Sequence, residues 1–162
     1  MKLESLDFEN GRMMAYRNAK HYQNMSPSVQ WTEIPEGTVE FALVCVEINP
    51  MMHIKVHWIV YNIPREITGI PAGLRCNETV DSLGFCSQGM NDWGRLGYDG
   101  PEWPLELTNQ FIFILYALRE KLNLPPGLPK VYLDQAIEGK VIEQSELFGL
   151  FYEGPVGAGE YR

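Results

Sequence analysis

Two residues with acid–base side chains, Glu47 and His57, lie in neighbouring apolar segments that have the length of β-strands. The segments are residues 41–48 and 54–63, and a short connection joins them. With a two-residue side-chain period, Glu47 shares one face of the first segment with Phe41, Leu43 and Cys45. A carboxylate in such a row is unusual, because burial of an unpaired charge costs free energy. If the two strands pair in an antiparallel hairpin, Glu47 and His57 approach one another near one end of a sheet.

The same period divides the second segment into two faces. It groups His57 with Lys55, Ile59 and Tyr61, and it puts Val56, Trp58 and Val60 on the opposite face. A neighbouring carboxylate orients an imidazole and favours its protonated form, so His57 would be a cationic hydrogen-bond donor for a small anion. The same pair could instead act as general acid and base in a hydrolase. A single histidine on an apolar strand face is also commonly a packed core residue.

Length and charge narrow the class of protein. The chain has 162 residues, a hydrophobic fraction of 45% and a net charge of −8, which predicts one domain, residues 1–162, with a full core. The acidic balance argues against a nucleic-acid partner or an anionic membrane surface. Three widely spaced cysteines form neither a disulfide framework nor a zinc pattern. The first residues contain no signal peptide or membrane span, so we expect a cytoplasmic protein.

The order of apolar segments predicts a mostly β protein, a β-sandwich of antiparallel sheets with one substantial helix. Short strands are expected within residues 1–8 and around residues 29–31, and a strand covered on both faces is expected over residues 110–118. Helical spacing of apolar residues predicts the helix over residues 131–141. Residues 146–152 fit either a last strand or a short helix, and residues 153–162 are expected to form a loose tail.

Six segments occur together along the chain: SPSVQW at 26–31, IPEGTVEFAL at 34–43, HWIVYNIP at 57–64, NDWGRLGYDGPEWP at 91–104, QFIFILYALREKLNLP at 110–125 and GKVIEQSELFGLF at 139–151. In this order they resemble the phosphatidylethanolamine-binding protein family. The chain most resembles the bacterial branch of this family, the Raf-kinase-inhibitor-like proteins. The resemblance covers nearly the whole chain.

This resemblance implies a β-sandwich with a small cavity near one end that accepts phosphate-like and carboxylate groups. It implies no catalytic activity shared across the family, whose members are ligand-binding modules or regulators of kinases, proteases and signalling partners. The family histidine that precedes a tryptophan matches His57, and the Gly-Pro loop matches Gly100 and Pro101. The family His-Arg-Tyr triplet is replaced by residues 109–111, so Asn109 and Phe111 stand where a histidine and a tyrosine are expected.

The carboxylate of the predicted site also differs from the family pattern. The Asp-Pro-Asp-Ala-Pro segment is absent, and a shortened connection leaves Glu47 as the nearest carboxylate. Backbone N–H groups between Gly97 and Gly100 are expected to approach the anion, because glycine has no side chain in the way. His53, in the altered connection, is an alternative replacement for the lost histidine. The predicted ligand-binding residues are Glu47, His57, Gly100, Pro101, Asn109 and Phe111.

Three functional hypotheses follow. The first is a non-enzymatic binding module for a small phosphate- or carboxylate-bearing ligand, with a kinase or protease as a protein partner. The second is a regulatory protein-interaction scaffold with a degenerate pocket. The third is a hydrolase that uses Glu47 and His57. The chain contains no Gly-x-Ser-x-Gly elbow, phosphate loop or clustered metal ligands, which disfavours an enzyme and predicts no cofactor and no metal. A homodimer is compatible with the sequence.

Overall fold

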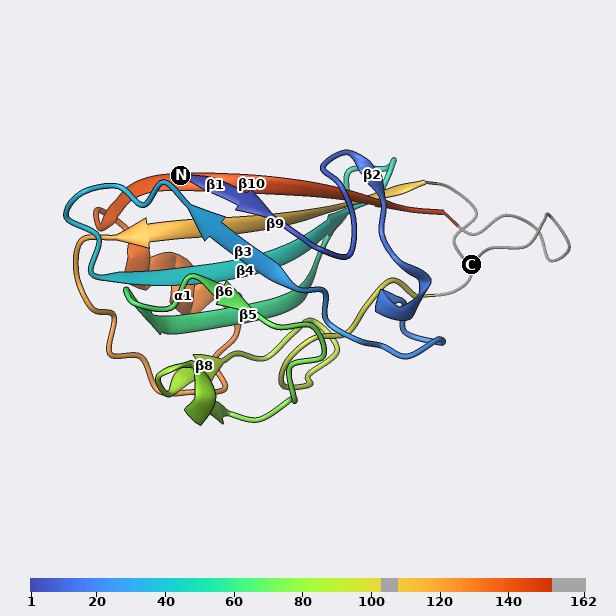
Figure 1. Cartoon of the computed structure of the whole chain (residues 1–162). Coiled ribbons are helices and arrows are strands. Elements are labelled where there is room, and N and C mark those ends of the chain that lie inside the picture. The colour runs from blue at the N-terminus through green and yellow to red at the C-terminus, as the bar shows by residue number, and fades with distance from the viewer. Residues whose placement is uncertain (103–107, 153–162) are drawn as a thin grey trace, which may run out of the picture.

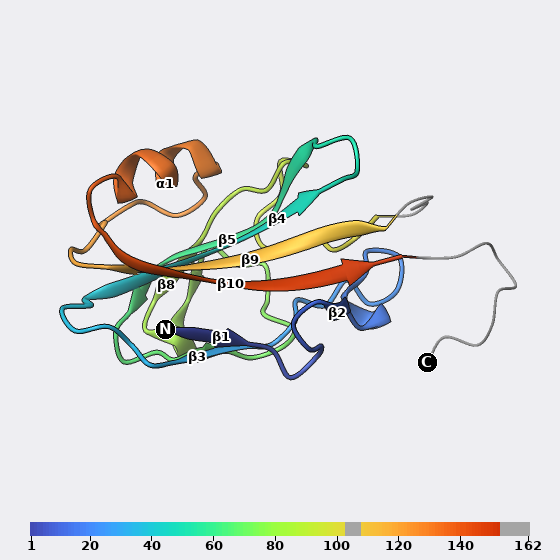
Figure 2. The same ribbon diagram turned by 90° about the horizontal axis from the view of Figure 1, so that it is seen from above.

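The computed structural model describes residues 1–102 and 108–152, and these residues form a β-sandwich with one α-helix (Figure 1). A three-stranded sheet has the order β1-β3-β6, and a seven-stranded sheet has the order β2-β10-β9-β4-β5-β8-β7. Seen from above, α1 covers one face of the large sheet and the small sheet lies on the other (Figure 2). The predicted sandwich is confirmed, although β2 pairs with β10 in parallel. The predicted tail, residues 153–162, lies outside the described residues.

The strands and helices have the following bounds. The strands are β1 (Lys2–Glu4), β2 (Arg12–Met13), β3 (Val29–Thr32), β4 (Glu40–Ile48), β5 (Ile54–Pro64), β6 (Gly69–Ile70), β7 (Thr79–Val80), β8 (Cys86–Gln88), β9 (Asn109–Leu118) and β10 (Val141–Phe151). The helices are the short 3₁₀ turns η1 (Tyr16–Asn18) and η2 (Asp81–Leu83), and α1 (Lys130–Ile137). No helix among the described residues has the length and apolar character needed to cross a membrane.

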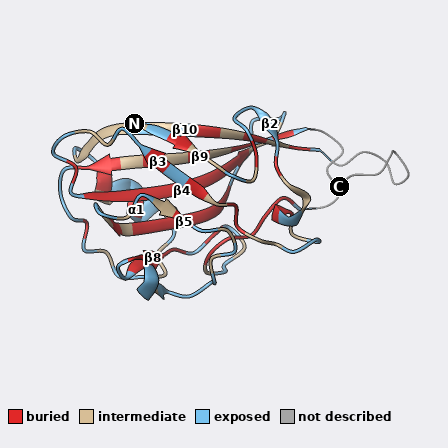
Figure 3. Cartoon of the chain, viewed as in Figure 1, coloured by how far each residue is buried: buried red, intermediate tan, exposed pale blue. Residues whose placement is uncertain are grey.

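The antiparallel hairpin of β4 and β5 lies at the centre of the large sheet, where side chains are buried on both faces (Figure 3). Its register places Glu47 opposite Lys55 and Cys45 opposite Trp58, while Val46 pairs with Val56. His57 is therefore the extra residue of a β-bulge, which shifts the side-chain alternation of β5.

The bulge corrects the predicted faces of β5. Trp58 and Val60 pack in the core between the two sheets, whereas Ile59, Tyr61 and Val56 pack on the helix side. The simple two-residue period wrongly separated Val56 from Ile59 and wrongly grouped His57 with Ile59. The extra residue lets His57 contact Phe111, a member of the core between the sheets.

The end of the helix and the start of the last strand also differ from expectation. α1 ends at Ile137, because Glu138 leaves helical geometry and Gly139 takes a left-handed φ of 74°. Val141, predicted to be helical, begins β10 instead. Residues 146–151 belong to this strand, and alternate residues Leu147, Gly149 and Phe151 are buried against the core.

Candidate functional site

His57 and Glu47 form a buried pair at the end of the β4–β5 hairpin. The Nε2 atom of His57 lies 2.7 Å from Oε2 of Glu47, and Nδ1 lies 2.6 Å from the backbone oxygen of Asp99. His57 is 0% exposed and Glu47 is 8% exposed. The predicted approach of the two side chains is confirmed.

The hydrogen-bond partners of this pair determine its charge. Burial alone would raise the pKa of Glu47, but the hydrogen bond and charge of His57, the amide of Asn109 and the charge of Lys55 together outweigh it and lower the pKa from 4.5. Glu47 is therefore ionised near neutral pH and can only accept hydrogen bonds, as can the carbonyl of Asp99. Both ring nitrogens of His57 then carry protons and donate. The result is an imidazolium–carboxylate pair with no net charge.

The predicted residues Asn109 and Phe111 lie beside this pair. The side-chain amide of Asn109 donates to Oε1 of Glu47. The ring of Phe111 meets the imidazole nearly edge-on at 5.1 Å between centroids, and Trp93 meets it at 4.8 Å. The imidazole is thus held between two aromatic rings, and both of its N–H groups are engaged inside the protein. This arrangement leaves His57 no N–H for an external anion, which differs from the donor role predicted for it.

Gly100 and Pro101 are next to the pair, but their backbone groups serve the fold. The N–H of Gly100 donates to Oδ1 of Asn24 at 2.8 Å, and a Cβ at Gly100 would lie 1.8 Å from the backbone oxygen of Asn18. The backbone oxygen of Pro101 accepts from the N–H of Lys20 at 2.8 Å. We expected glycine here to leave room for an anion. The observed reason is close packing of the loop on the chain around Asn18.

Asp99 is an organising residue that the sequence analysis did not select. Its carboxylate is buried and accepts from the side chains of Asn24 and Asn91 at 3.0 and 2.8 Å, with Arg95 at 3.4 Å. Its backbone N–H donates to the oxygen of His57, and its backbone oxygen accepts from the imidazole. A useful signal was present in the sequence, because an aspartate between Tyr98 and Gly100 in GYDGP has a small neighbour that permits close packing.

Two lysines that the sequence analysis also missed lie at the rim of the pair. The Nζ atoms of Lys20 and Lys55 lie 4.9 and 5.5 Å from the ring centroid of Trp93, the same ring that contacts His57. Lys20 also pairs with Glu102 at 3.2 Å, and Lys55 is exposed. His53 is exposed in the connection between β4 and β5. Among the described residues, no group of histidine, cysteine and carboxylate side chains could hold a metal ion.

The lowered pKa of Glu47 predicts how stability depends on pH. A carboxylate whose pKa is lower in the folded than in the unfolded state contributes stability above its unfolded pKa, and this contribution is lost as the pH falls through its folded pKa. We therefore expect the difference in free energy of unfolding between the native protein and Glu47→Gln to shrink as the pH falls below 4.5, the ordinary pKa of the Glu47 carboxyl group. Urea unfolding at a series of pH values measures this difference. A difference that grows on acidification would contradict the ion pair.

Comparisons with known proteins agree with this fold. Residues 4–153 match the family model of the phosphatidylethanolamine-binding protein. The UPF0098 protein of Methanothermobacter thermautotrophicus is 32% identical over 158 residues, covering 95% of this chain and 100% of that protein. The UPF0098 protein YbhB of Escherichia coli is 31% identical over 134 residues, covering 78% of this chain and 84% of that protein.

Two solved structures are similar as well. The phosphatidylethanolamine-binding protein homologue CT736 of Chlamydia trachomatis superposes with a TM-score of 0.82 at 25% identity, covering 94% of this chain and 97% of that chain. Escherichia coli YbcL shares the fold: it superposes with a TM-score of 0.85 at 22% identity, covering 94% of this chain and 98% of that chain. Together with the family model, which spans almost all of the sequence, these relatives show that the chain belongs to the phosphatidylethanolamine-binding protein family.

Proposed function

We propose that this protein is a non-enzymatic binding module that takes a phosphate or carboxylate group at the rim formed by Lys20, Lys55 and Trp93. The observation that supports the proposal is the convergence of two ammonium groups on one indole ring, directly beside the His57–Glu47 pair. Ammonium groups make charge-assisted hydrogen bonds to anions, which are roughly twice as strong as neutral ones. Since the pair below has no net charge, Glu47 does not cancel the field of the two lysines.

The proposed binding groups are the ammonium groups of Lys20 and Lys55, whereas the sequence predicted the imidazole of His57. His57 would act by holding Trp93 and the loop around Asp99 in place, and its two N–H groups would keep donating to Glu47 and to the backbone oxygen of Asp99. The ion pair of the half-buried Lys20 with the exposed Glu102 lies at the surface, and surface ion pairs contribute little stability in water, so an anion competes with it at small cost. Binding should therefore be weak, dependent on salt, and selective for charge more than for shape.

A titration with inorganic phosphate and with phosphoethanolamine tests the proposal. We expect saturable binding to the native protein and at least about a tenfold weaker affinity in the double variant Lys20→Gln with Lys55→Gln, since a charged hydrogen bond contributes about 1.5–3 kcal/mol. The matched control is Lys140→Gln, which removes one cation beyond the end of α1. Equal affinity of the native protein and the double variant would overturn the rim as the binding site.

A second candidate is a regulatory scaffold that recognises a protein partner, such as a kinase or a protease, and has no working anion pocket. It is favoured by the internal hydrogen bonds of His57, Asn109 and Gly100, which leave the donors of the predicted pocket already engaged. The absence of saturable binding of either phosphate compound to the native protein would favour this candidate. Turnover of a broad ester panel that is lost in Glu47→Ala would contradict both candidates and support a hydrolase.

A further inference from the structure

The outer edge of β10 is only partly paired. β2 pairs with Gly149 and Leu150, and the backbone oxygens of Phe148 and Leu150 accept from the N–H groups of Gly11 and Met14 at 2.8 and 2.9 Å. Backbone groups alternate sides along a strand, so those of Gln144 and Glu146 point to the same outer edge. Within residues 1–102 and 108–152, the pairing of this edge does not extend to Gln144 or Glu146.

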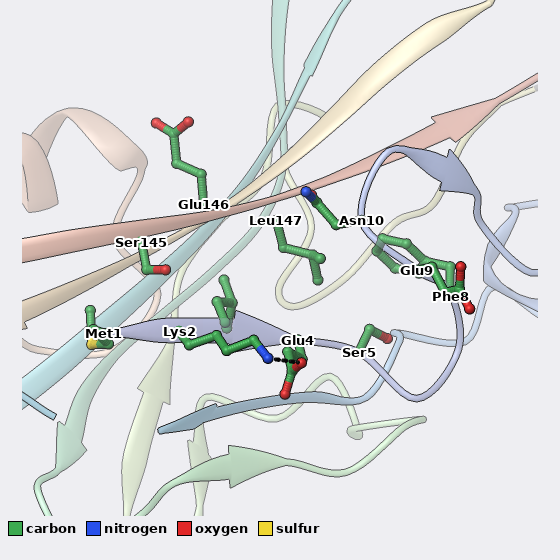
Figure 4. Close-up of a pocket in the computed structure, with 11 residues that line it drawn as sticks. Met1, Lys2, Glu4, Ser5, Phe8, Glu9, Asn10, Ser145, Glu146 and Leu147 are labelled. Atoms are coloured by element: carbon green, nitrogen blue, oxygen red, sulfur yellow. Dashed lines mark ion pairs between the residues drawn. The ribbon is translucent and has the colours of Figure 1, made fainter. Parts of the chain in front are cut away.

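A cavity of about 380 Å³ lies beside this edge, between β10 and β1 (Figure 4). Its floor is apolar and consists of the buried side chains of Leu3, Phe8 and Leu147. Figure 4 shows Ser145 and Leu147 pointing toward β1, while Glu146 points away from it. The volume falls in the range of about 300–1,000 Å³ that is usual for ligand pockets.

The opposite wall of the cavity also presents backbone groups. The N–H of Trp31 donates to the oxygen of Thr68 at 2.9 Å, so the backbone of Trp31 faces β6. Leu3 pairs with Trp31 in the β1–β3 ladder, and alternation then directs the N–H and oxygen of Leu3 away from β3. β1 is the outer strand of its sheet on that side. The cavity thus lies between the edges of two sheets, with an apolar floor and backbone donors and acceptors at its sides.

The charges around this cavity favour a basic occupant. Three glutamates, Glu4, Glu9 and Glu146, line the cavity, and Glu143 lies next to it on β10. The two cations of the lining are already paired: Lys2 with Glu4 at 2.8 Å, and the terminal amine of Met1 with Glu143 at 2.7 Å. A second copy of this chain, paired antiparallel on the same edge, would bring residues 143–146 against themselves. Like charges would then face one another, which is destabilising. The edge therefore disfavours a homodimer through β10.

We propose that residues 144–146 of β10 bind a short, basic, extended segment of another protein, which adds a strand to the seven-stranded sheet. An open strand edge is a template for such an added strand, in which main-chain hydrogen bonds provide affinity and alternate side chains provide specificity. Apolar side chains of the bound segment would lie on Leu3 and Leu147, and basic side chains would face the glutamates. This interaction is separate from anion binding at the Lys20–Lys55 rim.

The test uses an end-blocked peptide of alternating lysine and valine, at low ionic strength, with the full chain. We expect saturable binding that shifts the backbone amide signals of Gln144 and Glu146 in a ¹H–¹⁵N spectrum and leaves the indole signal of Trp93 unchanged. A glutamate–valine peptide and a backbone N-methylated lysine–valine peptide should each bind at least about tenfold more weakly, because they lack charge complementarity or main-chain donors.

Two variants decide between edge pairing and general charge attraction. Gln144→Pro removes an outward N–H while leaving the bonds to β9, since proline is tolerated where the N–H faces away from the sheet, and Gln144→Ala is its matched control. We expect about a tenfold loss of affinity in the proline variant and none in the alanine variant. Glu146→Lys, which leaves the backbone intact, should also weaken binding. Equal binding of both lysine–valine peptides, shifts confined to other strands, or unchanged affinity in Gln144→Pro and Glu146→Lys would overturn the proposal.

Discussion

Replacing His57 with alanine is expected to lower the free energy of unfolding by about 3–5 kcal/mol, the usual cost of removing one partner from a buried ion pair. The substitution leaves the Glu47 carboxylate in the protein interior without its cation and leaves the backbone oxygen of Asp99 without its donor. It also empties the space between Trp93 and Phe111. Urea unfolding at neutral pH measures the loss.

His53→Ala is the matched control, because His53 is an exposed histidine in the same hairpin. It should change stability by no more than about 0.5 kcal/mol. A double-mutant cycle with Glu47→Gln separates the pair from the cavity, since the two substitutions should be strongly non-additive. Additive effects, or a loss below about 1 kcal/mol in His57→Ala, would show that the pair does not stabilise the fold.

Gly100→Ala is expected to destabilise the protein by about 1–3 kcal/mol or more, the usual cost of overpacking. The added methyl group would lie 1.8 Å from the backbone oxygen of Asn18, which itself accepts a hydrogen bond from the Tyr98 hydroxyl. The loop must then move away from Asn18 or the chain around Asn18 must shift. Chemical denaturation measures the loss, and amide shifts of residues 18–20 report the movement.

Gly139→Ala distinguishes this steric effect from backbone strain. Gly139 has a φ of +74°, but a Cβ there would meet nothing within 4 Å. The substitution should therefore lower the free energy of unfolding only by the cost of the left-handed conformation, about 1–2 kcal/mol. Gly139→Ala should leave the amide signals of residues 18–20 in place. If Gly100→Ala has native stability and also leaves those signals unchanged, the contact between this loop and Asn18 is looser than described.

The fold could be predicted largely because its strongest signals are local. The two-residue period of the central segments located β4 and β5, and the antiparallel pairing brought Glu47 to His57. The same period failed for Ile59, because a bulge at His57 adds one residue to β5 and no residue type in the segment marks that position. Register shifts of this kind depend on packing against neighbouring strands.

The proximity of the selected residues could be predicted from the sequence, but the contacts that each of them makes could not. Glu47, Asn109 and Phe111 contact His57 or its partner, and Gly100 and Pro101 directly follow Asp99, whose backbone oxygen accepts from His57. The role of His57 was not predictable, because its second acceptor is a backbone oxygen 42 residues away, and every residue type carries one. The lysines of the rim were missed for a similar reason: Lys20 precedes β3 in a segment without a clear pattern, and the fold brings it to Trp93.

The His57–Glu47 pair is expected to stay closed while an anion binds at the rim. The side-chain ¹⁵N signals of His57, followed at neutral pH as phosphate is added, test this expectation. We expect both ring nitrogens to be protonated and to keep their shifts through saturation, while the signals of Trp93, Lys20 and Lys55 move. A ring nitrogen of His57 that is unprotonated, or whose signal shifts in proportion to bound phosphate, would show that the imidazole itself binds the anion or that the pair is not an ion pair.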